Sequence, residues 1–300
     1  MLRGLDHVVI AVRDLAEARG RYARLLGRDA GWRGRHPGLG TANALFDLGG
    51  VGLELLAADG GGPGASLVAR SLESRGEGLL ALAFATDAAA AASAALRARG
   101  VRAGDPRPGS GEDPESGAVR RWRTVDLPLS ATRGLPLFAI EREASAVTVA
   151  SGRSGAEAAR SEAQPSEVGD ALSEAIGLDH VVVTSADLEA SRAVYADRLG
   201  LRLALDRRFE DRGLRMLFFR VGGVTLEVVG RLGQNPDAAA PDAFGGLAYR
   251  VGDADAARAR VAAAGFEVSP VRDGARPGTR VCSVRGGTCG VPTLLIEVPA

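Results

Sequence analysis

The chain contains the same sequence signal twice. The six residues GLDHVV at positions 4–9 return at positions 177–182, so that His7 and His180 stand 173 positions apart. The same spacing holds for further pairs downstream, which are Asp14-Leu15 with Asp187-Leu188, Tyr22 with Tyr195, Leu26-Gly27 with Leu199-Gly200, and Leu53-Glu54 with Leu226-Glu227. A repeat that keeps one register over the first half of each copy predicts two domains of the same fold, and a length of 300 residues suits two domains.

The two predicted domains occupy residues 1–142 and 177–300. Near the end of each copy, Glu141 matches Glu297 at the shorter spacing of 156 positions, so the second copy has lost residues in its middle. The stretch 143–176 between the copies is rich in Ala, Ser, Gly and Glu and shows little apolar periodicity. This composition predicts a linker.

Within a copy, the pattern predicts a strand, a helix and then three strands. Residues 5–12 are an apolar, β-branched run typical of a buried strand, and Asp14 is placed to cap a helix that ends at Gly27. Strand-like stretches with glycine turns between them follow at 30–35, 42–48 and 51–57. The same scheme returns more weakly as a strand at 79–85, a helix at 88–99, and later strands near 119–125 and 137–142. Each domain is therefore predicted to contain two βαβββ units.

Composition narrows the classes of function. The 37 basic and 37 acidic residues give a net charge of zero and are scattered along the chain, which argues against nucleic acid and membrane surfaces as partners. No apolar run approaches the length of a membrane helix, and Cys282 and Cys289 fit neither a zinc motif nor a disulfide framework. The absence of lysine excludes Schiff-base chemistry. We expect a cytoplasmic protein, monomeric or homodimeric, whose partner is a small molecule.

With these elements in place, the sequence resembles the vicinal-oxygen-chelate superfamily of glyoxalases, bleomycin-resistance proteins and dioxygenases. The resemblance rests on the opening LDHVV, the DL and LG of the first helix, and the strand GGVxLE in both copies. It implies an α+β fold of tandem domains, in which two βαβββ modules per domain form a cupped mixed β-sheet with helices outside. The segment RHPGLGTAN at 35–43 also looks like the glyoxalase-like domain family, which marks His36 and Asn43 as candidate substrate contacts in domain 1.

The resemblance also implies a divalent metal, held in each cup by side chains of the first and fourth strands of each unit. The matching positions are His7, Glu54 and Glu141 in domain 1, and His180, Glu227 and Glu297 in domain 2. Glu54 and Glu141 are also the candidate catalytic residues. Because a carboxylate inside an apolar strand such as VGLELL is costly without compensation, Glu54 calls for a cation, an arginine or hydrogen bonds. Imidazole and carboxylate suit Zn, Ni, Co, Mn or Fe, and no organic cofactor is implied.

Other roles remain open for the same residues. His7 and His180 also suit a structural role, hydrogen-bonded near the helix cap. Glu54 and Glu227 could pair with arginines on adjacent strands, and Glu141 and Glu297 could be solvated strand ends. His36 is either a substrate contact or a loop residue. The last three candidates are consecutive, Arg121, Trp122 and Arg123. They either line a pocket for an anionic substrate or form an exposed strand face with one aromatic plug.

The match to the superfamily is incomplete. Its second histidine falls near Ala81 in domain 1 and near Leu247 in domain 2, and neither side chain binds a metal. We therefore do not expect extradiol dioxygenase chemistry, which needs two histidines and a carboxylate.

Three functions follow from these observations. The first is a divalent-metal-dependent lyase or isomerase that acts on a small substrate with adjacent oxygens. The second is a metal-free protein of the bleomycin-resistance type that binds and sequesters a small molecule. In the third, domain 2 is a structural partner that helps to shape one site in domain 1. We favour the first function for domain 1 and the third for domain 2.

Overall fold

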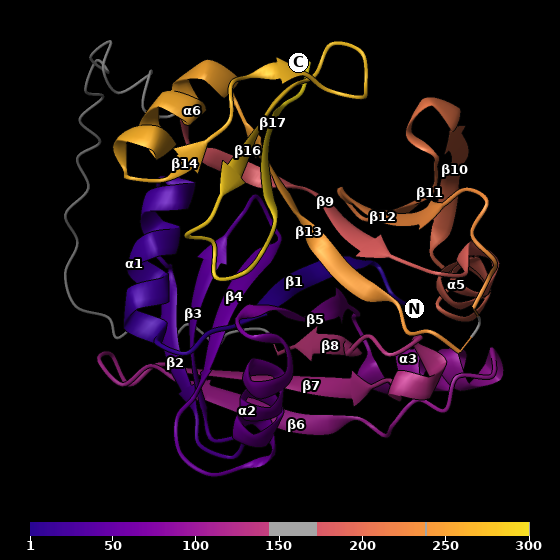
Figure 1. Ribbon diagram of the computed structural model, residues 1–300. Helices are drawn as coiled ribbons and strands as arrows, with labels where there is room; N and C mark the ends of the chain where they lie inside the picture. The colour runs from indigo at the N-terminus through magenta and orange to yellow at the C-terminus, as the bar shows by residue number, and fades with distance from the viewer. Residues whose placement is uncertain (144–172, 238, 300) are drawn as a thin grey trace, which may run out of the picture.

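The computed structural model describes residues 1–143, 173–237 and 239–299 and contains two β-sheet bodies that pack against each other (Figure 1). The predicted linker, 143–176, lies outside the described residues apart from its two ends, and the first strand of the second body begins at Ala175. Within the described parts of the chain, no helix is long and apolar enough to cross a membrane.

The first domain is a closed barrel of eight strands. Its elements are β1 (Gly4–Ala11), α1 (Leu15–Leu26), β2 (Trp32–His36), β3 (Thr41–Asp47), β4 (Gly52–Ala58), α2 (Pro63–Arg75), β5 (Gly78–Ala85), α3 (Ala89–Ala98), β6 (Arg107–Glu112), β7 (Val119–Asp126) and β8 (Leu137–Arg142). The strand order around the barrel is β1-β4-β3-β2-β6-β7-β8-β5. Strand β1 is parallel to β4 and β5 is parallel to β8, as two βαβββ modules require, so the predicted fold class is confirmed.

Two elements of this barrel were not predicted from the sequence. Helix α2 follows a run of glycines and begins at Pro63 without a side-chain cap, so its start carries only a weak sequence signal. Strand β6 has the sequence RPGSGE, which reads as a turn. Its glycines have a packing reason, because a Cβ at Gly109 would overlap the indole of Trp122 and a Cβ at Gly111 would lie 3.0 Å from the ring of His36.

The second domain is an open mixed sheet built by the same scheme. Its elements are β9 (Ala175–Thr184), α5 (Leu188–Arg192) with a π-helical extension (Ala193–Arg198), β10 (Arg202–Phe209), β11 (Leu214–Val221), β12 (Val224–Arg231), β13 (Ala243–Val251), α6 (Ala254–Ala263), β14 (Glu267–Val268), β15 (Arg272–Asp273), β16 (Arg280–Arg285) and β17 (Thr293–Glu297). The sheet order is β10-β11-β12-β9-β13-β17-β16-β14, and its outer strands β10 and β14 do not pair. This sheet is therefore a cup, whereas the first domain closes through the single register pair Arg35 and Glu112 between β2 and β6.

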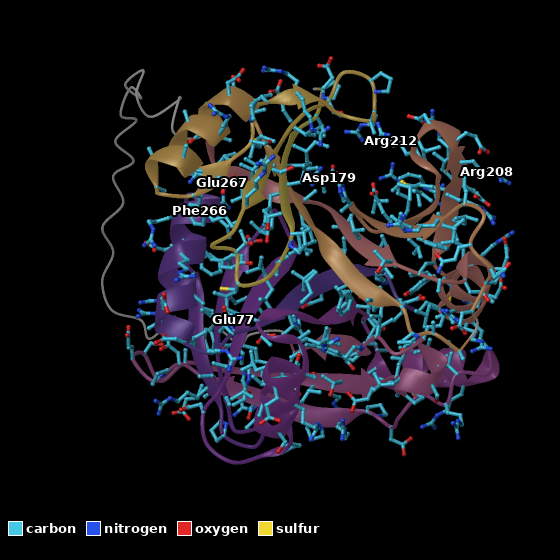
Figure 2. The ribbon with its side chains drawn as sticks, in the orientation of Figure 1. Glu77, Asp179, Arg208, Arg212, Phe266 and Glu267 are labelled. Carbon is cyan, nitrogen blue, oxygen red and sulfur yellow. The ribbon has the colours of Figure 1, made fainter. Side chains whose placement is uncertain are left out.

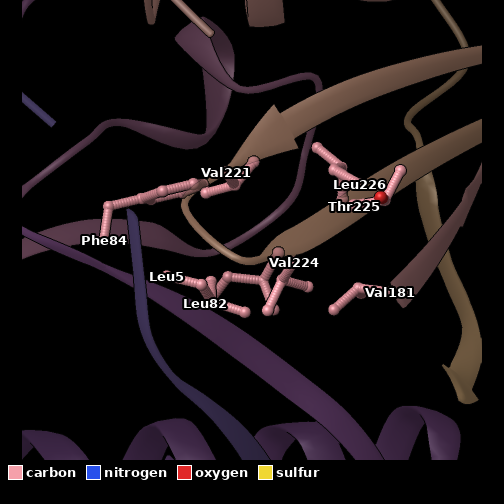
Figure 3. A pocket seen from close by; sticks show the side chains of 8 residues that line it. All are labelled: Leu5, Leu82, Phe84, Val181, Val221, Val224, Thr225 and Leu226. Carbon is pink, nitrogen blue, oxygen red and sulfur yellow. The ribbon is translucent and has the colours of Figure 1, made fainter. Parts of the chain in front are cut away.

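The two domains share one hydrophobic core. Buried residues from both belong to the same cluster, and at the contact Leu5, Leu82 and Phe84 face Val221 and Val224 (Figure 3). The cavity left between them is only about 10 Å³, and all of the residues that line it are apolar except Thr225. The two domains therefore pack against each other as closely as the interior of one protein, and their contact belongs to the folded core.

Candidate functional site

The alternation of β1 directs His7 into the barrel of domain 1. Val8 and Ile10 belong to the main hydrophobic core, whereas Val9 belongs to a separate small cluster with Ala81 inside the barrel. Since successive side chains of a strand point to opposite faces, His7 lies on the same face as Val9. Its ring also meets Phe138 of β8 edge to face, with 5.8 Å between the ring centroids.

A continuous chain of charged and polar groups runs through His7. Arg142 of β8 donates two hydrogen bonds to the carboxylate of Asp6, at 2.8 and 2.5 Å. Asp6 Oδ1 lies 2.5 Å from His7 Nδ1, and on the other side of the ring His7 Nε2 lies 3.3 Å from Glu54 Oε2. The second oxygen of Glu54 accepts a 2.5 Å hydrogen bond from Asn43 Nδ2. Among the described residues, Glu54 is therefore in direct contact with His7 and Asn43 and forms no ion pair with an arginine, which was the alternative that the sequence left open.

The pKa values of Asp6, His7 and Glu54 are all shifted from their ordinary values. Burial would lower the pKa of His7, but the hydrogen bonds with Asp6 and Glu54 outweigh burial and raise it to about 9. Burial would raise the pKa of both carboxyls, but Asp6 is stabilised by His7 and Arg142, and Glu54 by His7 and Asn43. The pKa of each carboxyl is therefore below its ordinary value. Without a metal, His7 is thus a cation between two carboxylates at neutral pH.

His36, Asn43 and Trp122 form a second group in the same barrel. His36 Nδ1 is 3.0 Å from the hydroxyl of Thr41, and its ring meets Trp122 edge to face, with 5.4 Å between the centroids. Burial lowers the pKa of His36. Asn43 is 5% exposed, and its Oδ1 is a buried acceptor without a hydrogen-bond partner among the described residues. Such an unpaired buried acceptor is uncommon and marks a place where a ligand donor or a water fits.

Glu141 does not join His7 and Glu54. Strand β8 places Phe138 on the barrel side, so Glu141, three positions later, lies on the opposite side. There its Oε2 accepts a 2.8 Å hydrogen bond from the backbone N–H of Ala89 at the start of α3. Glu297 does the same in domain 2, at 2.9 Å from the N–H of Ala254 at the start of α6. Both were predicted as metal ligands, and the structure instead places both at helix N-termini, because the alternation of the strand turns them away from the barrel and the cup.

The candidate anion-binding residues of β7 are also separated by strand alternation. Trp122 is half-buried against His36, whereas Arg121 and Arg123 are exposed on the other face of the strand. The arginine that does lie on the same face is Arg120, whose guanidinium is 4.1 Å from the ring centroid of Trp32. The structure therefore places Trp122 beside His36, and it places the two predicted arginines on the exposed face of β7.

The corresponding residues of domain 2 have a different geometry. His180 Nδ1 lies 2.9 Å from Asp179 Oδ2 and 3.8 Å from Glu227 Oε1, so both carboxylates face the same ring nitrogen. In the strand register, Phe209 and Met216 occupy the places of His36 and Asn43. Burial raises the pKa of Glu227. Domain 2 thus keeps the His–Glu pair of the repeat without the polar residues that surround it in domain 1.

A divalent metal fits the domain 1 site only in part. Asp6 occupies Nδ1 of His7, which leaves Nε2 facing Glu54, and ligand histidines commonly have a carboxylate on the other ring nitrogen in this way. His7 and Glu54 are therefore suitable as two ligands. Within the described residues, no group of three His, Cys, Asp or Glu side chains is arranged to hold a metal, so further ligands would come from water or substrate.

The comparisons with known proteins agree with this architecture. Residues 5–165 match the family model described as Glyoxalase-like domain, and residues 179–282 match the model described as Glyoxalase/Bleomycin resistance protein/Dioxygenase superfamily. The first match spans more than half of the chain, so the chain belongs to the glyoxalase-like domain family, within the vicinal-oxygen-chelate superfamily. No curated protein matches the chain.

Solved structures share the fold over nearly the whole chain. A mutant of 4-hydroxymandelate synthase from Streptomyces coelicolor is 18% identical, with a TM-score of 0.66, and the match covers 100% of this chain and 95% of that one. A hypothetical protein from Staphylococcus aureus is 10% identical, with a TM-score of 0.62 and coverage of 98% and 99%. The Mn(II)-bound glyoxalase from Novosphingobium aromaticivorans is 15% identical, with a TM-score of 0.59 and coverage of 99% and 82%. At these identities the similarity establishes the fold alone.

Proposed function

We propose that the barrel of domain 1 is an enzyme site that moves a proton on a small substrate with adjacent oxygens, in a lyase or isomerase reaction. The observation that carries the proposal is the chain from Asp6 through His7 to Glu54, beside the unpartnered Oδ1 of Asn43. Asp6 and Arg142 fix the orientation of the imidazole, and Asn43 fixes the carboxylate of Glu54. The structure thus supports a pre-positioned acid and base.

The residues of this chain supply two proton positions. Glu54 is an ionised carboxylate whose Oε2 contacts His7 and no other donor among the described residues, so it is the candidate base for a proton on carbon next to a carbonyl. Asn43 Oδ1 is an acceptor for a substrate hydroxyl, and Trp122 and His36 form an aromatic wall beside it. His7, His36, Asn43 and Glu54 are each less than 9% exposed, so the substrate is small and the reaction is shielded from bulk water.

A divalent metal held by His7 and Glu54 would polarise the substrate oxygens and stabilise negative charge on them. His7 cannot carry a proton on Nε2 and bind a metal through the same nitrogen. Metal binding at this nitrogen would therefore require the loss of that proton from His7 and would be favoured by rising pH.

A metal-free binding protein is the second candidate. One observation in its favour is that protonated His7 already pairs with both Asp6 and Glu54, so that no metal is needed to balance the two carboxylates. The other is that β5 places alanines, at positions 81 and 83, beside β1 and His7. In this case the barrel would bind a small polar molecule without converting it.

The enzyme and the binding protein differ in whether they convert a bound substrate. We would test 2-oxoaldehyde adducts and related small substrates with adjacent oxygens, using the protein loaded with Mn, Zn, Ni, Co or Fe in turn. The proposal predicts turnover that falls by about 100-fold or more in Glu54→Gln, because the base and a metal ligand are lost together, and that is retained in the matched Glu227→Gln variant. Turnover that survives in Glu54→Gln would refute the assignment, and saturable binding without turnover would select the metal-free binding protein.

A further inference from the structure

A second pocket, of about 490 Å³, lies where α1 of the first domain meets the second domain. Its lining includes Arg21 and Arg24 from α1, Glu267 at the start of β14 with Phe266 just before it, and Arg285 with the following glycines at the end of β16. Figure 2 shows Phe266 and Glu267 close to α1. The volume is within the range of small-molecule sites, which often lie at domain junctions.

The charges of this pocket are predominantly positive. Three guanidinium groups line it and only one carboxylate, that of Glu267. Arg21 is bound to Glu17 at 2.5 Å, and Arg285 lies 3.4 Å from Glu267 in an exposed pair. Arg24 has no acidic partner and no side-chain hydrogen bond within residues 1–143, 173–237 and 239–299. Exposed ion pairs contribute little, so an incoming anion can replace the carboxylate on Arg285 at small cost.

The backbone shapes the pocket between the arginines. Gly286 and Gly287 both have positive φ, 79° and 71°, and a Cβ at Gly287 would lie 3.1 Å from the ring of Phe266. Glycine thus lets this turn run close to the half-buried phenyl ring, which forms an apolar part of the lining. The pocket therefore combines an apolar surface with cationic groups on two sides.

We propose that this pocket binds a small polyanion, whose phosphate or carboxylate groups are held by Arg24 and Arg285. Guanidinium groups recognise both anions through paired hydrogen bonds. The site is separate from His7 and does not depend on the function proposed for the barrel. Because Arg24 and Arg285 come from different domains, a bound polyanion links the domains and stabilises their pairing.

Calorimetric titration of the full chain with inorganic pyrophosphate and with citrate tests the proposal. We expect saturable binding of at least one probe, weakened about tenfold or more by Arg24→Ala and by Arg285→Ala, since each removes a charge-assisted hydrogen bond. The matched control is Arg19→Ala, which removes the same charge from α1 outside the pocket. Tighter binding of pyrophosphate identifies phosphate as the preferred group, and tighter binding of citrate identifies carboxylate.

Thermal denaturation provides a second readout. A probe at 100 times its dissociation constant raises the melting temperature of the wild type and of Arg19→Ala, and raises it less in the two pocket variants. No saturable binding of either probe would overturn the proposal. Equal weakening in Arg19→Ala would also overturn it, because the attraction would then come from the general charge of the helix.

Discussion

At the scale of single residues, the protonation of His7 links the stability of the protein to pH. The pKa of His7 is raised from 6.5 to about 9 by Asp6 and Glu54, so the folded, chelated protein holds this proton more tightly than the unfolded chain. Its contribution to stability is fully present below pH 6.5 and is lost as the pH rises through 9. We predict that the free energy of unfolding of the chelated protein falls by up to about 3 kcal/mol over this range.

Urea denaturation at several pH values checks this prediction. The loss should disappear in His7→Gln and remain in the matched variant His180→Gln, which leaves the Asp6–His7–Glu54 chain intact. If His7→Gln shows the same loss of stability between pH 6.5 and 9 as the wild type, the raised pKa of His7 is not its cause.

The sequence predicted that His7 and Glu54 lie near each other, for identifiable reasons. The repeat marked His7 and the apolar strand marked Glu54, and both lie in the barrel together. Asp6 could have been recognised, since it directly precedes His7 in both copies of the motif. Arg142 could not, because its contact with Asp6 depends on β8 lying next to β5 and so only one strand away from β1, which no local pattern records.

At the scale of elements, Glu141 caps the N-terminus of α3. The cap residue Ala88 offers no side-chain acceptor, and the carboxylate of Glu141 accepts the N–H of Ala89 instead. We predict that Glu141→Ala lowers the free energy of unfolding by about 1 kcal/mol, as the loss of other helix caps does, without changing metal content. Glu297→Ala should cost less, because Asp253 also caps α6.

Chemical denaturation and elemental analysis of the two variants test this account of α3. Loss of metal in Glu141→Ala without loss of stability would restore Glu141 as a ligand. Strand alternation explains why the sequence assignment failed here, because a shift of one residue along β8 exchanges the barrel face for the helix face. Strand β6 was missed for a different reason. Its glycines indicate a turn in the sequence, and only the structure shows that Trp122 and His36 occupy the space where their Cβ atoms would lie.

At the scale of the whole molecule, a buried ion pair joins the domains. Arg133 Nε is 2.9 Å from Asp242 Oδ1, with side-chain exposures of 8% and 0%, and Asp242 also accepts hydrogen bonds from Ser191 and Tyr195. We predict that Arg133→Met destabilises the protein by about 3–5 kcal/mol, because the carboxylate of Asp242 remains buried without its cation. The pairing of the domains was expected from the repeat, but this contact between distant loops was not.

The control for this prediction is Arg3→Met, which breaks the exposed pair with Asp87. It should cost at most about 1 kcal/mol in the same denaturation experiment. Similar losses in the two variants would show that the buried pair contributes no more than an exposed one.

The central claim is that one working site, in domain 1, is built on His7 and Glu54. Elemental analysis of the purified protein, before and after chelation, tests it most directly when His7→Ala and His180→Ala are measured beside the wild type. We predict near-stoichiometric divalent metal that is lost in His7→Ala and retained in His180→Ala. Metal that follows His180 would place the site in domain 2, and no metal in any sample would contradict the metal-dependent enzyme and favour the metal-free binding protein.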